Sequence, residues 1–208
     1  MEIIKEKTVA IAGCHTAEIL SGKNDTNLLN VVFTETYLQV ASLYQQGFRT
    51  FLSSMSDGFE KIAAEAVLSF QREKEDIELI TVQPDFEMVW DEYLLANSCQ
   101  LICYCDNHDN DTMRIYERAK IEGMPTINLY TLLTDYFTNS SPAKQALQPY
   151  NNIDGFSYCK EGILLCYLYG EKPVITPFEN IEKVEQREDK IYVTLTNKLE
   201  VDAYLLTE

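Results

Sequence analysis

The chain has 208 residues, of which 46% are hydrophobic and 24% are charged, and its net charge at pH 7 is −16. This composition is that of a globular protein and excludes wholesale disorder. The strong negative charge and the lack of any basic run exclude direct binding to nucleic acid, and they disfavour binding to an anionic membrane surface.

The sequence has no apolar stretch that approaches the length of a membrane span. The first seven residues are charged and lack the apolar centre of a signal peptide. We therefore expect a cytoplasmic protein. The six cysteines form no Cys-x-x-Cys pair, which favours small buried hydrophobes in a reducing compartment over a zinc site.

Hydrophobic periodicity predicts strands and helices that alternate along the first two thirds of the chain. In chain order they are a strand over 8–13, a helix over 27–46, a strand over 48–53, a helix over 59–72, a strand over 77–82, a helix from about 86, a strand over 101–105, a helix over 112–122 and a strand over 126–129. Alternation of this kind favours a Rossmann-like, doubly wound, mainly parallel sheet of five strands, with the usual order 3-2-1-4-5.

The periodicity changes after this α/β region. Residues 139–160 are polar and contain prolines, which predicts a linker with room for one short helical turn, between a first domain over 1–138 and a small unit over 161–208. In that unit, strand patterns separated by turn signals at Glu188-Asp189 and Asn197-Lys198 predict an antiparallel β-meander. A sheet of so few strands is rarely stable by itself. We therefore expect the meander to pack on the first domain or on a second copy of the chain, and the second arrangement would make the protein a homo-oligomer.

In a doubly wound sheet, ligands bind outside the carboxyl ends of the strands. The loops there place residues of three kinds at the predicted ligand site: glycines, polar side chains before helices, and both histidines of the chain. They are Gly13, His15, Ser54, Ser56, Asp57, Gly58, His108, Asp111 and Thr112. Two of the loops lead into helix N-termini, whose free amides favour a phosphate, and a Mg²⁺ ion is a conceivable companion of such a ligand.

Each of these residues also has a simpler interpretation. Ser54, Ser56 and Asp57 are equally good helix caps. His15 and His108, with cysteines beside them, allow a nucleophile pair or a metal site, but no ligand spacing supports one and polar loop residues are favoured. The acidic loop over 106–111 is better explained as a solvated turn than as a cation site.

Three motifs in order resemble the SLOG superfamily, which includes the LOG and DprA/SMF proteins, and most of all its YpsA-like branch. The segment GFRTFLSSMSDGFEKIAAEAV resembles the first ligand loop of that branch, TVAIAGCHT its opening strand, and LICYCDNHDNDTMRIYERAKIEGMPTINLY its closing strand, loop, helix and final strand. The resemblance covers roughly 8–130. Matching positions are Gly13, Gly58, Glu60 (where Asp is usual), Ala63, Ala64, Glu65, Thr112, Ala119, Gly123, Pro125 and Asn128, while His15 is displaced by one.

The sequence also departs from these families. Asn110-Asp111 replaces a Gly-Gly pair that lets the backbone approach a phosphate. Arg114 and Ile115 stand where the LOG hydrolases, which resemble this fold, carry two glutamates. The missing acids argue against hydrolysis of the LOG type.

The resemblance implies binding of a nucleotide or nucleotide-derived small molecule, in a sensor or carrier role. One alternative is an N-glycoside hydrolase acting on a nucleotide, in which Glu60 is the catalytic candidate that positions or polarises water. The other is a non-catalytic assembly scaffold with a vestigial pocket.

Overall fold

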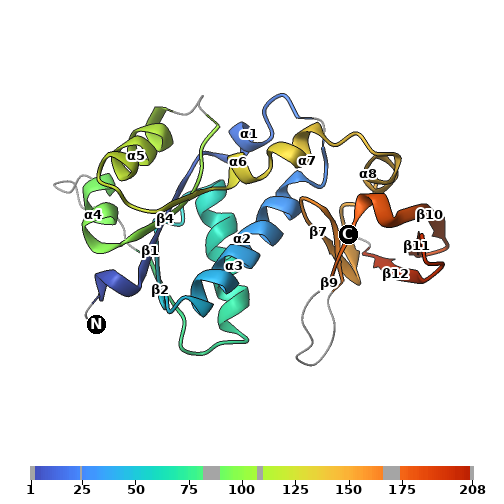
Figure 1. Ribbon diagram of the computed structural model, residues 1–208, viewed down its shortest axis with the longest axis horizontal. Helices are drawn as coiled ribbons and strands as arrows, with labels where there is room; N and C mark the ends of the chain where they lie inside the picture. The colour runs from blue at the N-terminus through green and yellow to red at the C-terminus, as the bar shows by residue number, and fades with distance from the viewer. Residues whose placement is uncertain (1–2, 24, 82–89, 107–109, 166–173, 207–208) are drawn as a thin grey trace. The chain divides into compact units, whose positions relative to one another are not determined.

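The structure is a computed structural model that describes residues 3–23, 25–81, 90–106, 110–165 and 174–206 (Figure 1). The chain forms two compact units, each with its own network of contacts. Unit 1 comprises Met1–Gly22 and Glu35–Leu133, and unit 2 comprises Lys23–Thr34 and Thr134–Glu208.

Unit 1 is built around a five-stranded, all-parallel sheet in the order β3-β2-β1-β4-β5. The strands are β1 (Thr8–Gly13), β2 (Thr50–Ser53), β3 (Glu78–Thr81), β4 (Gln100–Tyr104) and β5 (Thr126–Asn128). This confirms the predicted Rossmann-like α/β class, and the strand order is the usual one for that class. β1 and β4 lie at the centre and are buried along almost their whole length, as continuous apolar runs in parallel sheets are.

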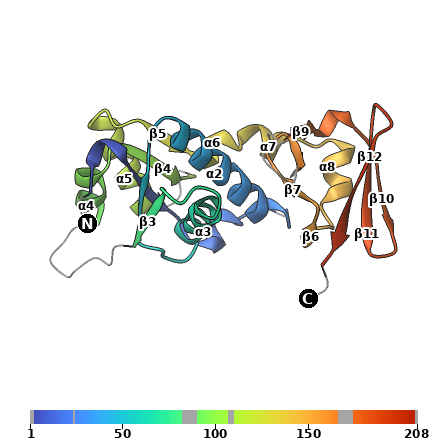
Figure 2. The ribbon, with the colours of Figure 1, turned by 90° about the horizontal axis from the view of Figure 1, so that it is seen from below.

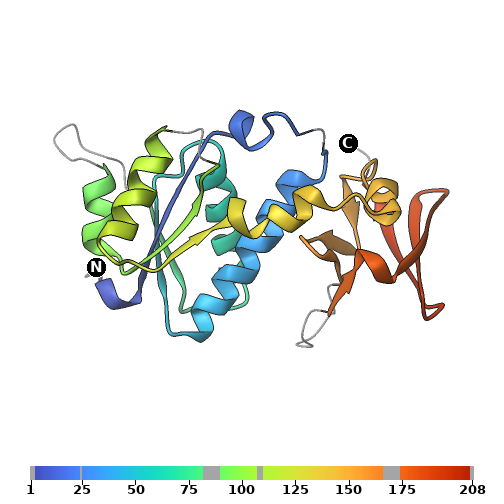
Figure 3. The same cartoon turned by 45° about the horizontal axis from the view of Figure 1, so that its top comes forward.

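Helices cover both faces of this sheet. α4 (Trp90–Asn97) and α5 (Asn110–Ile121) lie on one face, while α3 (Phe59–Gln71) and the second half of α2 (Leu28–Gln45) lie on the other (Figures 1 and 3). Short helices α1 (Thr16–Ile19) and α6 (Leu129–Leu132) follow β1 and β5, and a 3-10 turn, η1 (Lys5–Lys7), precedes β1. The helix predicted from about residue 86 is described only from Trp90 onward, and its earlier part lies outside the described residues.

Unit 2 has two antiparallel sheets, where the sequence predicted one meander. One sheet has the order β10-β11-β12-β6 and the other β7-β8-β9; β10, β11 and β12 lie side by side in Figure 2. The elements are α7 (Thr134–Thr138), α8 (Pro142–Leu147), β6 (Ile153–Asp154), β7 (Phe156–Tyr158), β8 (Gly162–Leu165), β9 (Val174–Pro177), η2 (Phe178–Asn180), β10 (Ile181–Arg187), β11 (Lys190–Leu195) and β12 (Glu200–Leu205). Both hairpin turns fall where predicted, with positive φ at Glu188 and Lys198.

The segment over 139–160, predicted as a linker with one short helical turn, carries the helix α8 and, in addition, the strands β6 and β7. Its proline and polar residues begin a helix: Pro142 takes the first helical position, where its missing N–H costs nothing, and the Ser141 hydroxyl accepts from the backbone N–H of Lys144. Polar composition alone therefore does not distinguish a capped helix from a linker.

Unit 2 also takes in Lys23–Thr34, which the sequence assigned to the first domain. Long-range hydrogen bonds within the unit explain this. The Thr26 hydroxyl donates to the carbonyl of Gln148, and the Asn27 side-chain amide donates to that of Leu147 over 3.1 Å. Residues more than a hundred positions apart are thereby joined, a pairing that local sequence patterns do not reveal.

A buried polar cluster lies inside unit 2. The Tyr136 hydroxyl donates to the Asp25 carboxylate over 2.8 Å, and the Lys144 ammonium lies 3.6 Å from the same carboxylate. The ammonium also donates to the Tyr136 carbonyl over 2.6 Å. Burial lowers the pKa of Lys144, and the nearby Asp25 charge opposes that shift.

Candidate ligand-binding site

The predicted site lies at the edge of the sheet in unit 1 where β1, β2 and β4 end, here called the carboxyl edge. β1 lies between β2 and β4, so the loops that follow these three strands meet there. The connection after β2 leads to α3 on one face, and the connection after β4 leads to α5 on the other (Figure 3). This reversal is the topological switch point at which such sheets bind ligands.

The loop after β1 is packed directly against the start of α3. Gly58 has φ +103°, and a Cβ there would lie 2.2 Å from the carbonyl oxygen of Cys14 and 2.6 Å from the Cα of His15. The Phe59 N–H donates to the Cys14 carbonyl over 2.9 Å, so one of the free amides of the helix is already used. A Cβ at Gly13 would lie 2.4 Å from the Phe59 ring, so both glycines are required by this contact.

Glu60, the catalytic candidate, is a buried residue on the first turn of α3, with 7% of its surface exposed. Its carboxylate accepts from the Ser54 backbone N–H over 3.2 Å and from the Ser54 hydroxyl. The backbone N–H groups of Ser56 and Gly13 also interact with it. The structure thus brings Gly13, Ser54, Ser56 and Glu60 together in one network.

The pKa of Glu60 reflects two opposing effects. Burial raises it above its ordinary value, because a charged carboxylate loses solvation inside the protein. The hydrogen bonds from Ser54, Ser56 and Gly13 favour the charged form and offset part of that rise. Because each of these donors is supplied by the protein itself, Glu60 is anchored in place by the loops around it.

The tip of the β2–α3 loop faces solvent. Met55, Ser56 and Asp57 are exposed, and Met55 adopts φ +56°, with its N–H donating to the Ser53 hydroxyl over 3.0 Å. His15 is also exposed; it precedes α1, and its backbone N–H donates to the Glu18 carboxylate over 2.9 Å. The loops that carry His15, Ser56 and Asp57 therefore lie at the carboxyl edge, with these three residues exposed.

The predicted site residues that follow β4 do not all face the same environment. Thr112 is buried in the first turn of α5, while the Asp111 side chain is 90% exposed. α5 begins at Asn110, two residues before the predicted start. His108 lies outside the described residues, as do Asn107 and Asp109.

Two residues that shape this side were not predicted as site residues. The Asn128 side chain accepts from the backbone N–H of Cys105 over 3.1 Å and donates to its carbonyl over 2.9 Å, so it fixes the backbone just beyond β4. Its side-chain oxygen also accepts from the backbone N–H of Tyr130, so Asn128 caps the N-terminus of α6. A polar amide directly at the end of a buried strand is the signal that indicates this role.

Tyr104 was also missed. It is the last residue of β4, paired with Gly13 of β1, and is fully buried between the rings of Phe59 and Tyr130. Its hydroxyl is buried and has no hydrogen-bond partner in the structure. Burial raises its pKa, with Cys14 and Asp106 adding to the rise, so the group is a neutral hydroxyl donor. A hydroxyl in an otherwise apolar strand is the signal that could have identified it.

The cysteines near the site are buried in the core. Cys103 and Cys105 pack with the apolar residues beneath α4 and α5, and burial raises the pKa of the Cys103 thiol. Over the part of the chain that the structure describes, no three His, Cys, Asp or Glu residues are grouped as metal ligands.

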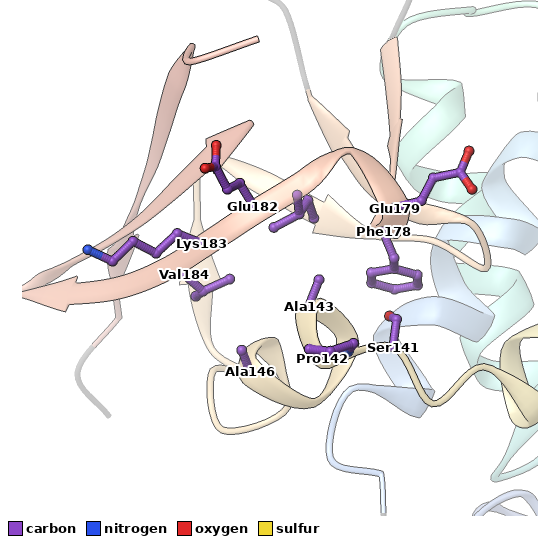
Figure 4. Close-up of a pocket in the computed structure, with 10 residues that line it drawn as sticks. Ser141, Pro142, Ala143, Ala146, Phe178, Glu179, Glu182, Lys183 and Val184 are labelled. Atoms are coloured by element: carbon purple, nitrogen blue, oxygen red, sulfur yellow. The ribbon is translucent and has the colours of Figure 1, made fainter. Parts of the chain in front are cut away.

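Unit 2 contains a separate pocket of about 480 Å³ between α8 and the start of β10 (Figure 4). The Phe178 ring faces Pro142 and Ala143 of α8, while the charged ends of Glu182 and Lys183 point away from that helix. None of the predicted site residues lines it.

In the described residues, no helix is both long enough and apolar enough to cross a membrane. Comparison with models of known protein families finds none that matches the chain. Comparison with curated protein sequences finds no match either.

Proposed function

We propose that unit 1 binds a nucleotide or nucleotide-derived small molecule at the carboxyl edge of its sheet, in a sensor or carrier role. The observation that carries the proposal is the switch point itself. β1 lies between β2 and β4, and the connections from these two neighbours leave on opposite faces of the sheet. The resemblance of the loops to the SLOG superfamily indicates the class of ligand.

The local geometry supports this proposal in two ways. The two loops at the centre of the edge are held rigid by the Gly58–Cys14 contact and by the Glu60 hydrogen bonds, and a preorganised site binds at lower entropic cost. The buried Tyr104 hydroxyl is a donor without a protein acceptor, and a ligand atom would satisfy it.

A thermal-shift screen of the purified chain tests the proposal. The panel is AMP, GMP, NAD, ADP-ribose, cyclic nucleotides and the parent nucleosides, each with and without Mg²⁺. A ligand at 100 times its dissociation constant stabilises the folded state by about 2.7 kcal/mol. That corresponds to a rise in Tm of roughly 5–10 °C for a chain of this size. A flat panel contradicts the proposal and favours the assembly scaffold.

The N-glycoside hydrolase remains a second candidate because of one observation. Glu60 is a buried carboxyl with a raised pKa beside the proposed ligand position, which is a common environment for a general acid or base. Under this candidate, Glu60→Gln abolishes release of the base from a bound compound while leaving its binding within a few fold. Wild-type protein that binds but releases no base refutes the hydrolase.

A further inference from the structure

The network around Glu60 has the composition of an anion-binding site. Backbone N–H groups from the end of β1 and from the β2–α3 loop converge on one point beside the first turn of α3, together with the Ser54 hydroxyl. Amides gathered near a helix N-terminus in this way bind phosphate in many α/β proteins. Here they bind a carboxylate that the chain itself supplies.

The Glu60 carboxylate already occupies donors that a phosphate would need. Ser54 donates to it through both its backbone N–H and its hydroxyl. The Ser56 N–H in turn donates to the Ser54 hydroxyl over 3.2 Å. Because Glu60 is 7% exposed and the loops around it are packed together, a phosphate would have to displace the carboxylate from a closed network.

The charges at the carboxyl edge also oppose a phosphate. Asp57 is exposed beside the first turn of α3, and no Lys or Arg occurs in residues 13–16 or 53–58. On the β4 side, Asp111 is paired with Arg114 over 3.9 Å, so its charge is partly balanced. A phosphate next to Glu60 would be repelled by the negative charge of the Glu60 carboxylate. That carboxylate is largely shielded from water, and Coulomb repulsion is stronger there than in bulk water.

What remains available suits an uncharged, hydroxyl-bearing ligand. The exposed carboxylate of Asp57 accepts hydrogen bonds from hydroxyl groups. The Tyr104 hydroxyl, on the strand next to Gly13, is a buried donor that still needs an acceptor. It is an observation independent of the Glu60 network.

We propose that the carboxyl edge is selective for a nucleoside over its phosphorylated forms, and that Glu60 determines this selectivity by occupying the phosphate position. This inference rests on the proposed function and narrows its ligand class. Glu60 acts here as an internal anion, so replacing it by a small side chain converts the network into an anion site.

Two arms of one experiment test this. In the first, Tm is measured in inorganic phosphate for the wild type, for Glu60→Ala and for Glu65→Ala. Glu65→Ala is the control, because it removes the same charge from the same helix. Glu65 is exposed, so its loss does not alter the network around Glu60. We expect Glu60→Ala alone to gain about 3–5 °C at phosphate about ten times its dissociation constant. Equal responses of the three proteins overturn the inference.

In the second arm, dissociation constants of nucleosides and of their 5′-monophosphates are measured for the wild type and Glu60→Gln. The wild type is expected to bind a nucleoside at least about tenfold more tightly than its monophosphate, and Glu60→Gln, which keeps the size but not the charge, to reduce that ratio. This variant serves also if Glu60→Ala fails to fold. If the wild type prefers the monophosphate, the inference is wrong but the proposed function stands. If the wild type binds neither compound, the proposed function is refuted. In that case the phosphate measurements of the first arm still decide the role of Glu60.

Discussion

The Cα of Gly58 lies so close to the backbone of Cys14 that a single added methyl group would lie 2.2 Å from the Cys14 carbonyl oxygen. This contact joins the loop after β1 to the start of α3 and fixes the distance between two of the strand ends that form the candidate site. The hydrogen bond from the Phe59 N–H to the same carbonyl strengthens the junction.

Gly58→Ala is therefore expected to destabilise the protein by about 2–5 kcal/mol, because it combines backbone strain with overpacking. Gly123→Ala is the matched control: Gly123 also has positive φ, but a Cβ there meets nothing within 4 Å. Its cost is expected to be about 1–2 kcal/mol, from conformation alone. Urea unfolding followed by circular dichroism measures both, and equal losses contradict the close contact.

Glu60 is expected to give the protein a distinctive pH dependence. Its folded-state pKa is raised above its unfolded value, so the folded state binds the proton more tightly. This group therefore favours folding most at low pH, and that contribution declines as pH rises from the unfolded pKa through the folded one. The free energy of unfolding of the wild type relative to Glu60→Gln should therefore fall as the pH rises above about 4.5. Glu65→Gln, at an exposed position, should show no such slope, and a slope in both variants would refute the assignment.

Tyr104→Phe is expected to leave stability unchanged or to raise it by about 1 kcal/mol, because a buried hydroxyl without a partner costs free energy. The matched control is Tyr158→Phe. Tyr158 is also buried, but its hydroxyl donates to the Tyr150 carbonyl, so its loss is expected to destabilise by about 1 kcal/mol. Thermal denaturation of both variants decides the matter, and a large loss at Tyr104 would show that the hydroxyl has an acceptor.

Within unit 2, Asp25→Asn is expected to destabilise by about 3 kcal/mol, because it leaves the buried Lys144 ammonium without its counter-charge. The control is Glu182→Gln, which breaks the ion pair between Glu182 and Lys198, whose side chains are 46% and 72% exposed. Such a pair contributes about 0–1 kcal/mol. If both substitutions cost the same, the cluster around Asp25 is not a buried one in solution.

The sequence predicted the architecture of unit 1 because its strands are short apolar runs bounded by residues that stop them. Gly13 ends β1, Gly47 follows α2, and Pro125 precedes β5. The parallel order then follows from the alternation of strands and helices. Unit 2 was predicted less well, because the bonds from Thr26 and Asn27 to carbonyls beyond α8 are long-range pairings without a local signature.

The sequence predicted which residues lie at the candidate site, but it did not predict which of them contact one another. The loop residues Gly13, His15, Ser54 and Ser56 follow from the strand ends alone. The burial of Glu60 had a signal: buried Ala63, Ala64 and Val67 lie three, four and seven positions further along, which places Glu60 on the inward face of α3. The hydrogen bonds from Ser54 to its carboxylate had none, because they depend on how the β2–α3 loop folds back onto the helix.

The most direct test of ligand binding at the carboxyl edge compares the wild type with Ser54→Trp by calorimetric titration of whichever compound raises Tm in the screen. An indole at position 54 fills the space beside Glu60 and removes the hydroxyl that donates to its carboxylate. Ser42→Trp, on the exposed side of α2, is the control. We predict that Ser54→Trp loses binding by about 100-fold or more, a loss of about 2.7 kcal/mol, while Ser42→Trp binds as the wild type does. Unchanged affinity in Ser54→Trp would place the ligand elsewhere and contradict the account.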